Sequence, residues 1–91
     1  RQRVGIRYHL GPIGREDTGR YITHRLLTAE GDQEVISEEA VDVIFRYSGG
    51  LPRVINNIAA NALLMGFSKD LSQIGPDIIL DVVEDLDLEP V

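Results

Sequence analysis

The chain contains no cysteine and no tryptophan among its 91 residues, and its only aromatic residues are three tyrosines and two phenylalanines. The absence of cysteine excludes disulfides and thiolate zinc sites, and it fits a reducing compartment. A core with so few aromatic residues must be mainly aliphatic. The sequence also has no signal peptide and no apolar run long enough to cross a bilayer. We therefore expect a small cytoplasmic domain that does not itself contact a membrane.

The residue patterns of an independent enzyme are missing as well. No G-x-x-x-x-G-K-[ST] loop is present, so the chain cannot bind and hydrolyse a nucleotide by itself in the usual way. His9 and His24 have no second histidine at metal-ligand spacing, and Ser37 and Ser48 have no evident His/Asp partners. We expect no metal site and no enzymatic activity in this chain alone.

Charge is distributed unevenly along the chain. Residues 1–25 contain six arginines and two acids, whereas residues 70–91 contain seven acids and no base. This asymmetry predicts one face that meets an anion and another that is solvated or meets a basic partner. The net charge of −6 argues against a free-standing nucleic-acid binder.

The N-terminal residues predict a strand. Residues 3–10 alternate apolar side chains with arginine, glycine and histidine, which is typical of a half-buried strand. A strand needs partners, and we expect them upstream in a longer protein, since the chain begins with Arg1 rather than Met. Residues 1–13 would then be the last strand and junction of a core domain.

Helical spacing of apolar residues predicts four helices in residues 14–91, which gives an all-α fold. Their expected ranges are 15–30, 38–47, 52–68 and 76–86. Ser37 is a suitable N-cap, Gly31 and Gly49 are suitable stops, and Pro52 and Pro76 suit first helical positions. The tail after residue 86 is expected to fray.

Each predicted helix has an expected buried face. These faces contain Thr18, Tyr21, Ile22, Leu26 and Ala29; Ala40, Val41, Ile44, Phe45 and Ser48; Val54, Ile55, Ile58, Ala59, Ala62, Leu63 and Gly66, widened by Leu64, Met65 and Phe67; and Ile78, Ile79, Val82, Val83 and Leu86.

The most informative stretch is residues 49–57, Gly-Gly-Leu-Pro-Arg-Val-Ile-Asn-Asn. It places Arg53 in the first turn of a helix, where unpaired N–H groups and the helix dipole favour anions rather than cations. A guanidinium in this position fits phosphate oxygens through its planar fork. The alternative is a solvated surface arginine.

Two other interpretations remain open. The helix pair on either side of Gly49 and Gly50 could be a helix-turn-helix in which Arg53, Asn56 and Asn57 face base edges. The lack of further Lys or Arg on the second helix argues against it. The acidic stretch 77–89 could instead dock a basic partner, as in a non-catalytic interaction module.

The order and spacing of several segments resemble one protein family. These segments are Gln2-Arg3-Val4, Arg7-Tyr8-His9-Leu10-Gly11-Pro12-Ile13, Glu16-Asp17-Thr18, Tyr21-Ile22, His24-Arg25-Leu26 and Ser48-Gly49-Gly50-Leu51-Pro52-Arg53-Val54-Ile55-Asn56. Together they are similar to the C-terminal lid of AAA+ ATPases of the general secretion pathway protein A (ExeA-like) type. More distant similarity extends to the lids of transposition and DNA-repair ATPases.

The resemblance implies that the chain is a sensor-2 lid that closes over ATP, with Mg²⁺ supplied by an absent core. Arg53 would be the sensor-2 arginine that reaches the γ-phosphate. Pro52 and Gly50 belong to the same motif, and Tyr21, Ile13 and Pro12 would line the adenine side. Gly14 stands where relatives often have a Ser or Asp cap.

The resemblance also implies partners. Arg3, or failing that Arg7, would be an arginine finger directed to the ATP of a neighbouring subunit. The lid would contact its own AAA+ core and the neighbouring subunits, in a protein that serves secretion or envelope assembly and can be anchored to the inner membrane.

Overall fold

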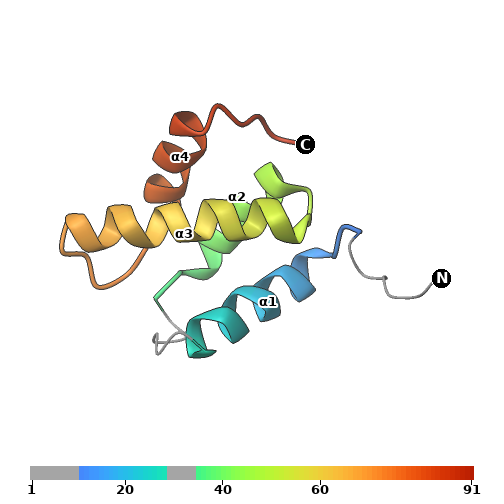
Figure 1. Ribbon diagram of the computed structural model, residues 1–91, viewed down its shortest axis with the longest axis horizontal. Coiled ribbons are helices and arrows are strands. Elements are labelled where there is room, and N and C mark those ends of the chain that lie inside the picture. Colours follow the sequence, from blue (N-terminus) through green and yellow to red (C-terminus); the bar gives the residue numbers. More distant parts are fainter. Residues whose placement is uncertain (1–10, 29–34) are drawn as a thin grey trace.

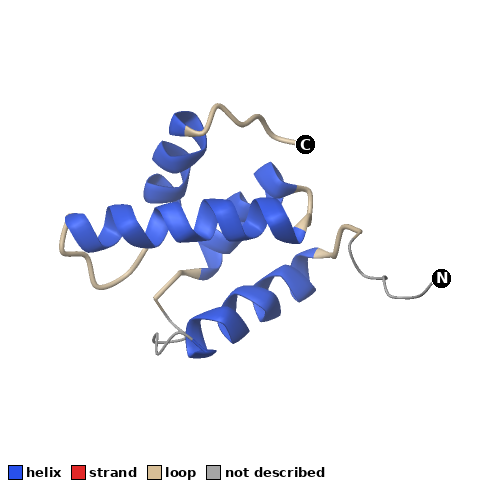
Figure 2. Ribbon diagram, viewed as in Figure 1, coloured by secondary structure: helices blue, strands red, loops and turns tan. Residues whose placement is uncertain are grey.

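The computed structural model describes residues 11–28 and 35–91, which form four α-helices (Figure 1). The helices are α1 (Arg15–Thr28), α2 (Glu38–Ser48), α3 (Pro52–Ser68) and α4 (Pro76–Asp85). Figure 2 shows only helices and loops in this part of the chain, so the predicted all-α fold is confirmed. Three predictions lie outside the described residues: the strand at 3–10, residues 29 and 30 of the first helix, and the stop at Gly31.

The longest helix, α3, separates α1 from α4. In the described part of the chain α1 and α4 make no contact with each other, and they lie on opposite sides of α3 (Figure 1). The helix α2 contacts all three others. A parallel bridge between Ile36 and Ile74 joins the segments that lead into α2 and α4, because the Ser37 N–H donates to the Ile74 carbonyl at 3.0 Å.

Local backbone chemistry sets the helix ends. The Ser37 hydroxyl oxygen accepts a hydrogen bond from the Ala40 N–H at 3.1 Å, which caps α2. Gly49 ends α2 in the left-handed region with φ 62°, and Pro52 begins α3. No side chain of the described residues caps α3, since its N-cap is Leu51. The Val54 and Ile55 N–H groups donate to the Leu51 carbonyl at 3.0 and 2.9 Å, and Pro52 has no N–H. Only the Arg53 N–H of this turn therefore has no acceptor in the described residues.

Loss of the Ser37 cap should weaken the fold measurably. We expect Ser37→Ala to lower the free energy of unfolding by about 1 kcal/mol, because it removes the acceptor for the Ala40 N–H. Urea denaturation followed by circular dichroism measures this. Ser72→Ala, an exposed loop change, serves as control. An equal loss of unfolding free energy in both variants would show that the Ser37 cap does not stabilise the fold.

The core is aliphatic, as predicted, and all four helices and the Ile36–Ile74 bridge contribute to it. Its buried members are Ile22, Ile36, Ala40, Val41, Val43, Ile44, Ile55, Ile58, Ala62, Ile74, Ile78, Ile79, Val82 and Val83. No helix in the described residues is both long and apolar enough to cross a membrane.

Four apolar residues differ from the predicted faces. Leu64 and Phe67 are 69% and 86% exposed, so they do not widen the core face of α3. They lie on its outer side, away from the residues that α1, α2 and α4 cover. On α2, Val43 is buried while Phe45 is only half-buried. The reason is that α2 contacts three other helices, so its buried face is wider than the predicted one and includes Val43.

The prediction that the tail frays is wrong. The Leu88 N–H donates to the Val83 carbonyl at 2.9 Å, and the Val91 N–H donates to the Arg46 carbonyl at 2.9 Å. Leu88 is half-buried against the core. The tail is therefore fixed to α4 at one end and to α2 at the other.

Candidate functional site

The turn between α2 and α3 has an unusual backbone. Gly49 and Gly50 both have positive φ, at 62° and 83°, a region that side-chain-bearing residues adopt at a cost. The Gly50 N–H donates to the hydroxyl oxygen of Ser48 at 3.1 Å, and Ser48 is buried. The turn is thus held from within, directly before α3.

The segment before α1 packs on this turn. The Ile13 N–H donates to the Gly50 carbonyl at 2.8 Å. A Cβ on Gly50 would lie 1.9 Å from the Ile13 carbonyl oxygen, so only glycine fits there. The structure therefore brings together Ile13 and Gly50, which the sequence assigned to one site. Pro12 is exposed next to Ile13, and Pro52 is half-buried in the first turn of α3.

Arg53 is exposed in the first turn of α3. That turn holds no acidic residue, and Arg53 makes no ion pair or side-chain hydrogen bond within residues 11–28 and 35–91. The guanidinium, the open N–H of Arg53 and the positive end of the helix dipole lie in one turn, where no acidic residue or capping side chain of the described residues neutralises them. Such an end can accept an anion with several oxygens.

Two of the other described arginines, Arg15 and Arg20, are already paired. Arg15 pairs with Asp42 and Glu38, and its hydrogen bond to Asp42 raises the pKa of the guanidinium above its ordinary value. Arg20 pairs with Glu16 and Asp17 on its own helix. These arginines join α1 to α2 or stabilise α1, so the arginine-rich N-terminal part of the chain is partly structural. Arg3 and Arg7 lie outside the described residues.

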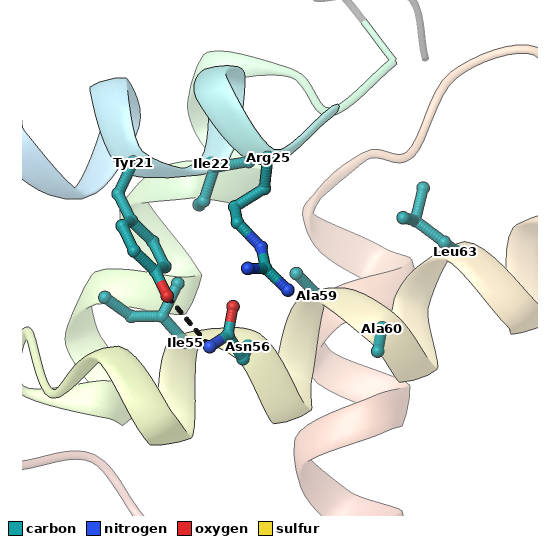
Figure 3. Close-up of a pocket in the computed structure, with 8 residues that line it drawn as sticks. All are labelled: Tyr21, Ile22, Arg25, Ile55, Asn56, Ala59, Ala60 and Leu63. Atoms are coloured by element: carbon teal, nitrogen blue, oxygen red, sulfur yellow. Dashed lines mark hydrogen bonds between the residues drawn. The ribbon is translucent and has the colours of Figure 1, made fainter. Parts of the chain in front are cut away.

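A groove of about 270 Å³ lies between α1 and α3 (Figure 3). Its floor is apolar and its rim carries three polar side chains; the lining residues are Tyr21, Ile22, Arg25, Ile55, Asn56, Ala59, Ala60 and Leu63. The Asn56 amide donates to the Tyr21 hydroxyl oxygen at 2.8 Å across the groove. Figure 3 shows the Arg25 guanidinium extending from α1 toward α3.

The groove and the turn adjoin. Arg53, Asn56 and Ala60 are spaced by three and four residues, which places them along one side of α3. Asn56 and Ala60 line the groove, so Arg53 stands at the end where α3 begins. The arrangement suits a ligand with a flat, largely apolar part and a separate anionic part.

Two polar lining residues, Arg25 and Asn56, were not predicted as residues of the nucleotide site. Arg25 follows Tyr21 by four residues, and Asn56 follows Arg53 by three, so helical spacing alone places them beside predicted positions. What the sequence did not provide is the pairing of α1 with α3, which is a contact between distant segments.

The hydrogen bond between Tyr21 and Asn56 fixes α1 against α3. We expect Tyr21→Phe to lower the free energy of unfolding by about 1 kcal/mol, since it removes one partly buried hydrogen bond and keeps the ring. Tyr47→Phe is the control, since the half-buried Tyr47 makes no side-chain hydrogen bond in the described residues. Urea denaturation of both variants checks this, and a larger loss for Tyr47→Phe would contradict it.

A relative among known proteins matches most of this chain. The chain is 38% identical over 68 residues to general secretion pathway protein A of Aeromonas hydrophila. The match covers 75% of this chain but 12% of that protein, so the chain corresponds to a small part of its relative. No family model and no solved structure matches. The resemblance inferred from the sequence is confirmed at this level: the chain is related to general secretion pathway protein A.

Proposed function

We propose that this chain, a relative of general secretion pathway protein A, is the sensor-2 lid of an AAA+ ATPase. It would close over ATP held by a core domain that these residues do not include. The observation that carries the proposal is Arg53, an exposed and unpaired arginine in the uncapped first turn of α3. A γ-phosphate there would meet both the guanidinium and the positive end of the helix.

The adjoining surfaces support the same ligand. The apolar groove between α1 and α3 offers a place for the adenine ring beside Tyr21. Ile13 is bonded to Gly50 in the turn before α3, and Pro12 precedes it in the chain. Gly50 and Pro52 set the direction of the turn that presents Arg53. The core would supply the phosphate loop and Mg²⁺.

ATP would act as a bridge between core and lid. With the γ-phosphate present, its contact with Arg53 favours the closed arrangement, and hydrolysis removes that contact. The lid then opens, which changes the contacts between subunits. Arg3, or failing that Arg7, would direct its guanidinium to the ATP of a neighbouring subunit and stabilise charge in the transition state. We place this machine in the cytoplasm, where it serves secretion or envelope assembly.

Hydrogen exchange tests this function. In the longer protein that carries this chain, ATPγS should slow amide exchange in residues 50–56 more than ADP does. The reason is that closure of the lid on a triphosphate removes this turn from solvent. If no nucleotide changed exchange anywhere in residues 11–91, the chain would not be an ATP lid.

A second function is favoured by the surface of α4. Its acids Asp77, Asp81, Glu84 and Asp85 are all exposed and make no ion pair in the described residues, and Leu80 among them is 44% exposed. Such a face could dock a basic partner protein. Reversing the charge of Asp81, Glu84 and Asp85 would abolish that association and leave ATP turnover nearly unchanged.

A further inference from the structure

The turn that leads to Arg53 is contacted from two sides. Ile13 bonds to Gly50 on one side, and Val91 lies against Gly49 on the other. A Cβ placed on Gly49 would lie 3.1 Å from Cγ2 and 3.2 Å from Cγ1 of Val91. The two methyl groups of Val91 thus lie beside the position that a side chain on Gly49 would occupy.

The tail carries Val91 to this position along a fixed path. After α4, the Leu86 N–H bonds to the Val82 carbonyl, and Asp87 turns the backbone with φ 60°. Leu88 packs on the core, and the Val91 N–H bonds to the Arg46 carbonyl in the last turn of α2. Figure 1 shows the tail running from α4 back toward the turn where α2 ends and α3 begins.

We infer that Val91 is a positioning residue for Arg53. This rests on the proposed function. Gly49 and Gly50, with their positive φ values, set the direction in which α3 begins, and Arg53 is four residues after Gly49. The bond from Gly50 to Ser48 holds the turn from within, but glycines have few restraints of their own, so the residues that pack against the turn also influence its angle. Val91 supplies that packing on the side that Ile13 does not reach.

The inference goes beyond a lid that senses phosphate. The segment after α4 lies against Gly49, and the segment before α1 is bonded to Gly50. A displacement of either segment would therefore change the position of Arg53. Any partner or domain that pulled on the tail would then alter the response to the γ-phosphate. The contact of Arg53 with the γ-phosphate would then depend both on the nucleotide and on the position of residues 87–91.

Val91→Ala in the longer protein tests this, because it removes only the two methyl groups that contact Gly49. We expect the affinity for ATPγS to fall roughly threefold to tenfold while the affinity for ADP is unchanged. Val91 is 86% exposed, so the midpoint of urea unfolding should stay at the wild-type value. Val91→Ile, which keeps both methyl positions, should restore the ATPγS affinity. Amide exchange at Gly49 and Gly50 should be faster in Val91→Ala alone.

The controls separate this inference from the proposed function. Leu64→Ala removes another exposed apolar side chain, toward the far end of α3, and should change neither affinity. If Val91→Ala kept the wild-type ratio of ATPγS to ADP affinity while Arg53→Ala lowered it, the positioning role would be wrong and the lid function would stand. If Arg53→Ala also kept that ratio, both would be wrong.

Discussion

Arg53→Ala in the longer protein is expected to lower the rate of ATP hydrolysis by about 10- to 100-fold. A hydrogen bond to a charged group contributes about 1.5–3 kcal/mol, and each 1.4 kcal/mol is a factor of ten in rate. The alanine variant would lose this contact without disturbing the core, because Arg53 is exposed and pairs with no described residue. Steady-state phosphate release at saturating ATP measures the effect.

Two control variants make the result specific to this guanidinium. Arg53→Lys keeps the charge but loses the planar fork, so its rate should lie between those of the wild type and the alanine variant. Lys69→Ala removes an exposed cation at the other end of α3 and should leave the rate unchanged. Equal losses in Arg53→Ala and Lys69→Ala would indicate a general electrostatic effect instead.

Gly50→Ala is expected to lower the free energy of unfolding of the chain by about 3 kcal/mol. The φ of 83° at Gly50 is strained for alanine, and the added Cβ would lie 1.9 Å from the carbonyl oxygen of Ile13. That oxygen belongs to the backbone and cannot rotate away as a side chain could. Urea denaturation measures the loss, and lifting of Ile13 from the turn is the expected structural result.

Gly11→Ala is the matched control for this substitution. A Cβ at Gly11 meets no atom within 4 Å, so we expect a change of no more than about 0.5 kcal/mol. If Gly50→Ala were as stable as Gly11→Ala, the contact between the turn and the segment before α1 would not exist in solution.

The helix ends could be predicted because they depend on local chemistry. Ser37 caps α2 through a neighbour three residues away, Gly49 ends it with a positive φ, and Pro52 and Pro76 begin the next helices. Each of these effects needs only the residue and its immediate neighbours, so one sequence contains enough information.

The errors concern contacts between distant segments. The tail looked frayed because it is terminal and polar, and the contact of Val91 with Gly49 joins residues that lie far apart in the sequence. The exposure of Leu64 and Phe67 likewise depends on how far the neighbouring helices extend along α3. An apolar pattern on a helix identifies a possible core face but does not show what covers it.

For the site, the sequence predicted Arg53, Gly50 and Ile13, and the structure places the last two in direct contact. The groove beside Tyr21, with Arg25 and Asn56, could not be predicted without knowing that α1 packs on α3. The roles of Arg53 at the γ-phosphate and of Arg3 as a finger stay predictions, since they concern groups outside this chain.

The most direct test of the central claim is calorimetric titration of ATPγS and of ADP into the longer protein, with and without Arg53→Ala. The account predicts that the variant loses affinity for ATPγS about 10-fold or more and keeps the wild-type affinity for ADP. Equal affinities of variant and wild type for both nucleotides would contradict it and would leave Arg53 as a solvated surface residue.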